Sequence, residues 1–235
     1  MKLMDKLLLN LFPSRCILCQ QTVGQGLEVC SACYLALPHN ETCCVRCALP
    51  LAQDTGGSVL CGRCIKTPPA FDYAHSPFRY EDEIITLVHQ LKFSEKIRFS
   101  RSIGEMLWQH FSTTDERPDC LLPVALHKSR MRQRGFNQSI EISRELAKKL
   151  SVPIEHSAVL RQRHTPAQTG LSAKQRQKNI RGAFMMAGEL NYKHVLIIDD
   201  VMTTGATVNE LAKLLKKNRV ERVGVLSIAR APVKG

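Results

Sequence analysis

The sequence predicts an α/β protein whose parallel sheet carries helices on both faces, preceded by a small cysteine-rich domain. Nine of the ten cysteines lie before residue 65, and the later part of the chain alternates short aliphatic runs with amphipathic segments. This alternation is typical of parallel sheets with helical crossovers. Two prolines in "KTPPAFD" end the cysteine-rich region, so we predict domains at residues 1–68 and 69–235.

The first domain contains four consecutive CxxC knuckles, a spacing that lets two thiolates hold one metal ion from a tight turn. Two such knuckles complete a tetrahedral sulfur site, and the expected metal is zinc in a structural role. A redox CxxC usually occurs once, and a disulfide framework requires an oxidising compartment. The spacing allows sequential or interleaved pairing and allows Cys43 to replace Cys44. The predicted ligands are Cys16, Cys19, Cys30, Cys33, Cys44, Cys47, Cys61 and Cys64.

The first half of the second domain begins with an extended segment, "FDYAHSPFRY". The segment "EDEIITLVHQLKF" places Ile84, Val88 and Leu91 on one helical face, and a second helix is expected over residues 97–111. "DCLLPVAL" has the character of a strand. "NQSIEISRELAKKL" is predicted to be a helix with Asn137 as its N-cap.

The second half of this domain predicts a strand, a helix and a further strand. "HVLIID" is a short aliphatic run bounded by polar residues, as expected of a central parallel strand buried on both faces. "TVNELAKLLKKN" is amphipathic through Val208, Leu211, Ala212 and Leu215. "RVGVLSIA" then returns as a strand, which completes a right-handed crossover.

The stretch "VLIIDDVMTTGATV" predicts the ligand site, because ligands bind beyond the carboxyl ends of strands in open parallel sheets. Asp199 and Asp200 are expected where the aliphatic strand ends. The next residues predict a tight turn into a helix N-terminus, where backbone N–H groups hold an anion. Carboxylates beside a phosphate suit a ligand that also offers neutral hydroxyls, as ribose 5-phosphate does. The cradle residues are Thr203, Thr204, Gly205, Ala206 and Thr207.

This stretch resembles the signature of type I phosphoribosyltransferases, which bind phosphoribosyl pyrophosphate (PRPP). Together with the cysteine knuckles, "PPAFD", "HQLKF", "RGFNQS" and "LSAKQRQKNIRGAF", it resembles the ComF/GntX family over nearly the whole chain. The resemblance implies a type I phosphoribosyltransferase-like sheet, Mg²⁺ bound with PRPP, and a role in natural competence or the use of external DNA. Asp199 and Asp200 would position the ribose in any transfer reaction.

Two basic segments are the candidates for binding pyrophosphate. The segment after "LLPVAL" carries Lys128, Arg130, Arg132 and Arg134 in an expected loop, and residues 161–181 contain several cations, including Arg176, and no acid. By resemblance to the transferase fold, the first segment is the better pyrophosphate site, and residues 164–181 are the better lid. The alternative is a solvated basic face.

The net charge of +12 favours polyanionic partners, either nucleic acid or a small molecule with several phosphates. The apolar run "LLLNLF" is too short to span a membrane, so we expect a cytoplasmic protein. The first functional hypothesis is a Mg²⁺-dependent phosphoribosyltransferase. The alternative is a non-catalytic protein that senses PRPP or binds single-stranded DNA through the same basic segments, with competence-machinery proteins as further partners. Neither the acceptor nor the oligomeric state follows from the sequence.

Overall fold

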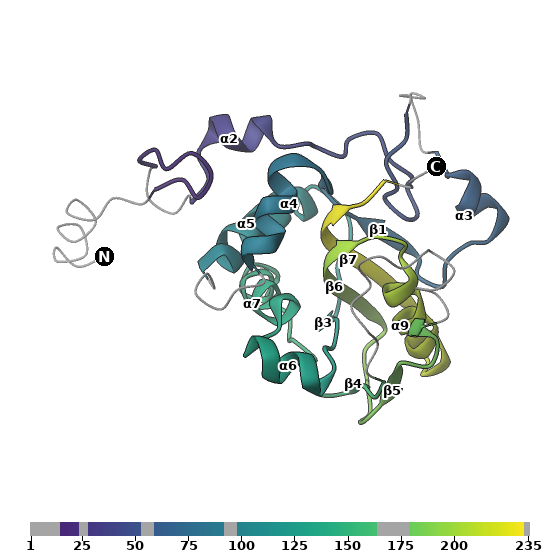
Figure 1. The fold of residues 1–235 in the computed structure, drawn as a ribbon. Coiled ribbons are helices and arrows are strands. Elements are labelled where there is room, and N and C mark those ends of the chain that lie inside the picture. Colours follow the sequence, from purple (N-terminus) through teal and green to yellow (C-terminus); the bar gives the residue numbers. More distant parts are fainter. Residues whose placement is uncertain (1–14, 24–27, 53–58, 92–97, 164–178, 233–235) are drawn as a thin grey trace.

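A computed structural model describes residues 15–23, 28–52, 59–91, 98–163 and 179–232 (Figure 1). Its main sheet is entirely parallel, with the strand order β1-β7-β6-β3, and β2 continues the β1 edge by pairing with β7. These strands are β1 (Tyr73–His75), β2 (Phe78–Arg79), β3 (Cys120–Pro123), β6 (His194–Met202) and β7 (Arg222–Arg230). The predicted parallel α/β sheet is confirmed.

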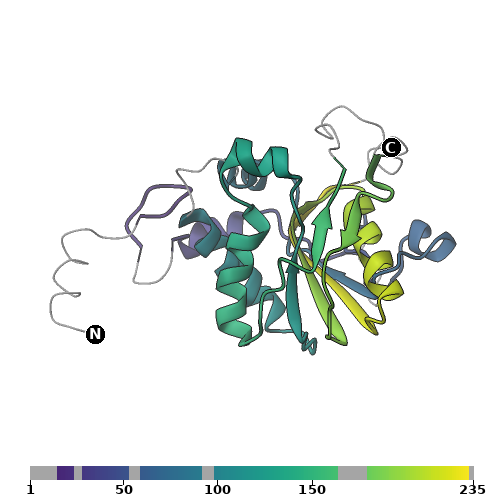
Figure 2. The ribbon, with the colours of Figure 1, turned by 90° about the horizontal axis from the view of Figure 1, so that it is seen from below.

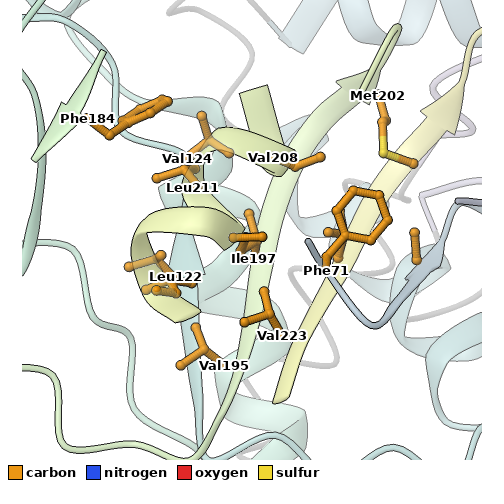
Figure 3. Packing of buried hydrophobic residues seen from close by; sticks show 14 of the residues in the cluster. Phe71, Leu122, Val124, Phe184, Val195, Ile197, Met202, Val208, Leu211 and Val223 are labelled. Atoms are coloured by element: carbon orange, nitrogen blue, oxygen red, sulfur yellow. The ribbon is translucent and has the colours of Figure 1, made fainter. Parts of the chain in front are cut away.

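The central strand β6 is buried on both faces, because its aliphatic residues alternate between two cores. Val195 and Ile197 belong to one cluster, and Leu196 and Ile198 belong to the other. All four side chains are fully buried. Figure 3 shows Val195, Ile197 and Leu211 among the side chains of the first cluster. A continuous aliphatic run is therefore what this strand requires.

Helices cover both faces of the sheet, as predicted (Figures 1 and 2). The face of Leu196 packs against three amphipathic helices, whose buried residues share one cluster. The opposite face packs against α9 and against a two-stranded antiparallel hairpin. The three helices are α4 (Asp82–Leu91), α5 (Arg98–Phe111) and α7 (Gln138–Leu150); α9 spans Ala206–Lys217, and the hairpin strands are β4 (Val159–Arg161) and β5 (Phe184–Met186).

Two elements differ from the sequence prediction. The basic segment after β3 is not a loop but a helix, α6 (Lys128–Arg134). His127 caps its N-terminus by accepting from the backbone N–H of Ser129, and Gly135 ends it with a left-handed backbone at φ 76°. Arg, Lys, Gln and Met all favour helix, which explains the segment between these caps. The hairpin of β4 and β5 was not predicted, because its strands are three residues long and far apart in sequence.

The cysteine-rich region contains only short helices among its described residues, α2 (Ser31–Ala36) and α3 (Gly62–Lys66). Its two halves pack differently. Ile17, Val29 and Leu37 join the cluster that contains α4 and α5, whereas the cysteines from Cys44 to Cys64 join the cluster that contains α9. Within the described part of the chain, no helix has both the length and the apolar character needed to cross a lipid bilayer.

A half-buried histidine on β1 predicts loss of stability in acid. The ring of His75 packs against His110 and Phe111, and burial followed by the charge of His110 lowers its pKa to about 4, with Glu116 opposing. The unfolded chain takes up this proton near pH ~6.5, so protonation favours unfolding as the pH falls below that value. We expect the free energy of unfolding to fall by about 1–2 kcal/mol between about pH 7 and about pH 5.

Denaturant titration at the two pH values checks this expectation. His75→Gln should flatten the decrease, whereas replacing the exposed His89 by Gln should leave it unchanged. An equally steep decrease in the His75→Gln protein would assign the acid sensitivity to other groups.

Candidate functional site

A cavity of about 360 Å³ opens at the carboxyl end of the sheet. It brings together the end of β6, the turn into α9, one face of α6, the start of α7 and the β4 strand of the hairpin. This is the position where parallel sheets bind ligands. Its polar lining residues are Tyr80, Arg130, Arg134, Gln138, Ser139, Arg161, Asp199, Asp200, Thr203, Thr204 and Thr207, with Gly205 and Ala206 between the threonines.

The paired acids lie within β6 rather than after it. The strand continues to Met202 by pairing with β7, so Asp199 lies opposite Ser227. On the other side, the β3 ladder stops where Pro123 pairs with Ile198. The expectation that the strand ends at the acids is therefore wrong, because pairing with the long neighbour β7 keeps it extended to Met202. Both carboxylates still line the cavity.

Local hydrogen bonds fix the backbone between the two carboxylates. The Asp199 carboxylate accepts from the N–H of Asp200 at 2.9 Å, and the Asp200 carboxylate accepts from the N–H of Val201 at 2.7 Å. Burial and the charge of Asp200 raise the pKa of Asp199 well above its ordinary value. A ligand that donates hydroxyl hydrogen bonds or brings a cation would relieve this repulsion.

The turn after β6 has the geometry predicted for an anion cradle. Gly205 is the N-cap of α9 and has a left-handed backbone, with φ 74° and ψ 4°, which favours glycine. The side chain of Thr204 accepts from the N–H of Ala206 at 3.3 Å. Thr203, Thr204 and Thr207 line the cavity around the start of this 12-residue helix. Helix N-terminal N–H groups and these hydroxyls can together bind a phosphate.

The α6 helix divides its four cations between two faces. Arg130 and Arg134, one helical turn apart, line the cavity. Lys128 and Arg132, also one turn apart, are exposed and do not line it. The structure therefore brings only half of this predicted set to the acids. Arg176 and most of the predicted lid lie outside the described residues.

Arg161 is the first residue of the second predicted basic segment, and it lines the cavity although only Arg176 of that segment was singled out for the site. It comes from β4, and its guanidinium lies 5.6 Å from the ring centroid of Phe184. Burial and the charge of Arg130 lower the pKa of Arg161, while Asp199 opposes this shift. Burial and Arg130 also lower the pKa of Arg134. Guanidiniums stay charged in proteins, so this crowding creates a positive site that an anion would stabilise.

Gln138 was not predicted as a site residue, although it lies in the quoted motif "RGFNQS". It is the first residue of α7, is 2% exposed and lines the cavity, and its side-chain nitrogen has no hydrogen-bond partner among the described residues. The preceding Asn137 caps α7 as predicted, and its side chain also donates to the Val124 carbonyl at 3.0 Å. Asn137 therefore holds the start of α7 against the end of β3. The N-cap was the signal that could have located Gln138.

The cysteines form two separate tetrads, each built from consecutive knuckles, which settles the pairing as sequential. The four sulfurs of each set lie within 4.8 Å of one another, and Cys43 is in neither set. One sulfur pair in each tetrad is 3.7 Å apart. Tetrahedral zinc with Zn–S bonds of about 2.3 Å separates its sulfurs by about 3.8 Å. The tetrads are Cys16, Cys19, Cys30 and Cys33, and Cys44, Cys47, Cys61 and Cys64.

Backbone N–H groups stabilise the thiolate form of one cysteine in each tetrad. Cys30 donates its N–H to the sulfur of Cys16 at 3.4 Å, and Cys61 donates to Cys44 at 3.3 Å. Burial opposes ionisation, but these donors, together with other backbone N–H groups of the same knuckles, outweigh it and lower the pKa of Cys16 to about 6 and that of Cys44 to about 7. Four sulfurs with such donors fit a structural zinc ribbon, which has no open position for a substrate.

Comparisons with known proteins match both parts of the chain. The double zinc ribbon domain matches residues 7–65, and the phosphoribosyl transferase domain matches residues 93–235. DNA utilization protein YhgH of Escherichia coli (strain K12) is 34% identical over 224 residues, which cover 93% of this chain and 97% of that protein. Competence protein F of Haemophilus influenzae is 32% identical over 235 residues, covering 95% of this chain and 100% of that protein.

A solved hypoxanthine phosphoribosyltransferase from Staphylococcus aureus is 17% identical, with a TM-score of 0.33, and the match covers 57% of this chain and 63% of that one. The family assignment depends instead on the two domain matches and on the relatives that are at least 32% identical over most of both chains. The chain therefore belongs to the ComF/GntX family, in which a double zinc ribbon domain precedes a phosphoribosyl transferase domain.

Proposed function

We propose that the cavity at the end of β6 binds PRPP and that the protein is a Mg²⁺-dependent phosphoribosyltransferase. The observation that carries this proposal is the composition of one cavity. Paired carboxylates, a helix N-terminus with three threonines, and three arginines all line it. PRPP carries the matching groups, namely a ribose with two hydroxyls, a single phosphate and a pyrophosphate.

Each part of the ligand has a corresponding part of the site. The single phosphate fits the turn from Thr203 to Thr207, and the ring hydroxyls fit Asp199 and Asp200 as acceptors. The pyrophosphate fits the guanidiniums of Arg130, Arg134 and Arg161, because charge-assisted hydrogen bonds to phosphate are strong. The side-chain nitrogen of Gln138, which has no hydrogen-bond partner among the described residues, would supply a neutral donor in the same cavity.

The proposed reaction is displacement at the anomeric carbon of PRPP. The bond to pyrophosphate breaks as an acceptor atom forms its bond to that carbon, and positive charge develops on the ribose ring. Mg²⁺ bound with PRPP would neutralise charge on its oxygens. Arg130, Arg134 and Arg161 would stabilise the departing pyrophosphate, while Asp199 and Asp200 would hold the ring and balance its developing charge.

Pyrophosphate release tests whether the chain turns over PRPP. Zinc-loaded protein is incubated with PRPP, Mg²⁺ and, in turn, each common purine and pyrimidine base. Release that depends on one base would identify the acceptor and support the transferase. PRPP binding without release with any base would overturn the catalytic part of the proposal and favour the PRPP-sensing alternative.

A second candidate function is binding of single-stranded DNA beside the same cavity, because α6 presents exposed Lys128 and Arg132 next to the cavity residues Arg130 and Arg134. A DNA backbone on this helix would approach the pyrophosphate site. We therefore expect saturating Mg²⁺–PRPP to weaken binding of a labelled oligonucleotide at fixed salt, measured by fluorescence anisotropy. Unchanged DNA affinity would contradict a shared surface.

The proposal also covers the metal, the compartment and the cellular role of the protein. The tetrads would each hold one structural zinc ion, in a domain that ends near residue 68. Free thiols and zinc thiolates favour a reducing compartment, consistent with the cytoplasm. The names of the relatives, DNA utilization protein and Competence protein F, support a role in the uptake or use of external DNA, with competence-machinery proteins as partners.

A further inference from the structure

A buried arginine joins the second tetrad, formed by Cys44, Cys47, Cys61 and Cys64, to the turn from Thr203 to Thr207. We call this turn the phosphate-binding turn. Arg230, the last residue of β7, is 2% exposed. Its Nε donates to the carbonyl of Cys47 at 3.1 Å, and its Nη1 donates to the carbonyl of Met202 at 2.8 Å and also to that of Thr203. One guanidinium thus spans a zinc knuckle and the start of the turn.

Arg63, which lies between Cys61 and Cys64, makes a second connection. Its guanidinium donates to the carbonyl of Thr204 at 2.9 Å. The second tetrad also shares its hydrophobic cluster with Met202, Ala206 and Val208 of the turn and helix.

These contacts require the knuckle carbonyl to stay in place. A buried guanidinium must have its donors satisfied, and Arg230 donates to the backbone carbonyls of Cys47, Met202, Thr203 and Ala231. Loss of the metal would loosen the knuckle and move the carbonyl of Cys47. Arg230 would then reorient, and the carbonyls of Met202 and Thr203 would lose the donor that fixes the turn.

The first tetrad provides an internal contrast. Its neighbours Ile17, Val29 and Leu37 pack in the other cluster, with α4 and α5, and Ser102 donates to the carboxylate of Glu28. Among the described residues, no hydrogen bond joins this tetrad to the turn. The two metal sites of one double ribbon therefore differ in what they support.

We infer that the second tetrad, through the positioning residues Arg230 and Arg63, holds the phosphate-binding turn in its binding geometry, whereas the first does not. This inference rests on the proposed function for its ligand. Coupling is reciprocal, so PRPP binding should also strengthen zinc retention at the second tetrad by the same factor. Metal loading of one ribbon thereby sets PRPP affinity.

The test compares two arginines at the same position of a CxxC knuckle. Arg63 donates to Thr204, whereas Arg46 donates to the carbonyl of Pro69 at 3.2 Å. Calorimetry with Mg²⁺–PRPP on zinc-loaded, folded proteins should show an affinity loss of about 5- to 10-fold for Arg63→Ala and less than about 2-fold for Arg46→Ala. Arg63→Lys should recover part of the loss. Equal affinities for the two alanine variants would overturn the inference.

Zinc release to a chelator gives a second measurement that does not depend on activity. PRPP should slow the release of one zinc equivalent in wild type, and Cys16→Ser, which removes the first site, should keep this protection. If wild type binds no PRPP, the proposed function fails by itself. The coupling is then judged by Gly205→Ala, which strains the turn at φ 74° and should release one zinc equivalent faster without ligand. Unchanged zinc release in that variant would overturn the coupling.

Discussion

The double variant Asp199→Asn/Asp200→Asn should bind Mg²⁺–PRPP about 100-fold more weakly than wild type, because hydrogen bonds to charged groups contribute about 1.5–3 kcal/mol each. Amides keep the shape of the carboxylates but remove the negative charge that the ring hydroxyls and Mg²⁺ would meet. The same change removes the buried charge and the repulsion from Asp200, which together raise the pKa of Asp199. The folded protein should therefore be at least as stable, so calorimetry would report binding and not unfolding.

Asp115→Asn is the matched control, because it removes one negative charge at an exposed position that does not line the cavity. Its PRPP affinity should equal that of wild type. If the double variant also binds PRPP with wild-type affinity while the protein stays folded, the acids do not contact the ribose. The ligand would then have to be placed elsewhere.

The second large effect is expected from a single ligand cysteine. Cys44→Ser should lower the zinc content from two equivalents to one and unfold the second ribbon, since a structural zinc site contributes about 10–16 kcal/mol of binding free energy. The tetrad packs in the same cluster as Val208 and Leu211, so the thermal midpoint of the whole chain should also fall. Metal analysis and thermal unfolding measure the two effects.

The neighbouring Cys43→Ser is the control for this experiment. Cys43 lies next to Cys44 in the chain but outside both tetrads. Burial and then the charge of Cys44 raise the pKa of Cys43. This variant should keep two zinc equivalents. Loss of zinc from Cys43→Ser, with retention in Cys44→Ser, would reverse the ligand assignment.

Features encoded within a few neighbouring residues could be predicted from the sequence. The aliphatic run of β6, the amphipathic pattern of α9 and the Asn137 cap each depend on local spacing, and the structure confirms all three. The TTG turn and the CxxC knuckles are also contiguous. The structure therefore places the acids, the threonines and two of the predicted arginines around one cavity.

Features that depend on distant contacts could not be predicted. Arg161 reaches the cavity because β4 pairs with β5 more than twenty residues later in the chain, and Arg230 contacts Cys47, which lies 183 residues earlier. The α6 helix could not be recognised from the sequence, because the segment has no apolar stripe. Its four cations alternate between a cavity face and an exposed face. The boundary at residue 68 remains a prediction.

The measurement that tests the central claim most directly is calorimetric titration of PRPP with Mg²⁺ into the zinc-loaded wild-type protein. We predict saturable binding at one site per chain, with the affinity lost in Asp199→Asn/Asp200→Asn and kept in Asp115→Asn. The absence of binding by folded protein that carries two zinc equivalents would contradict the account.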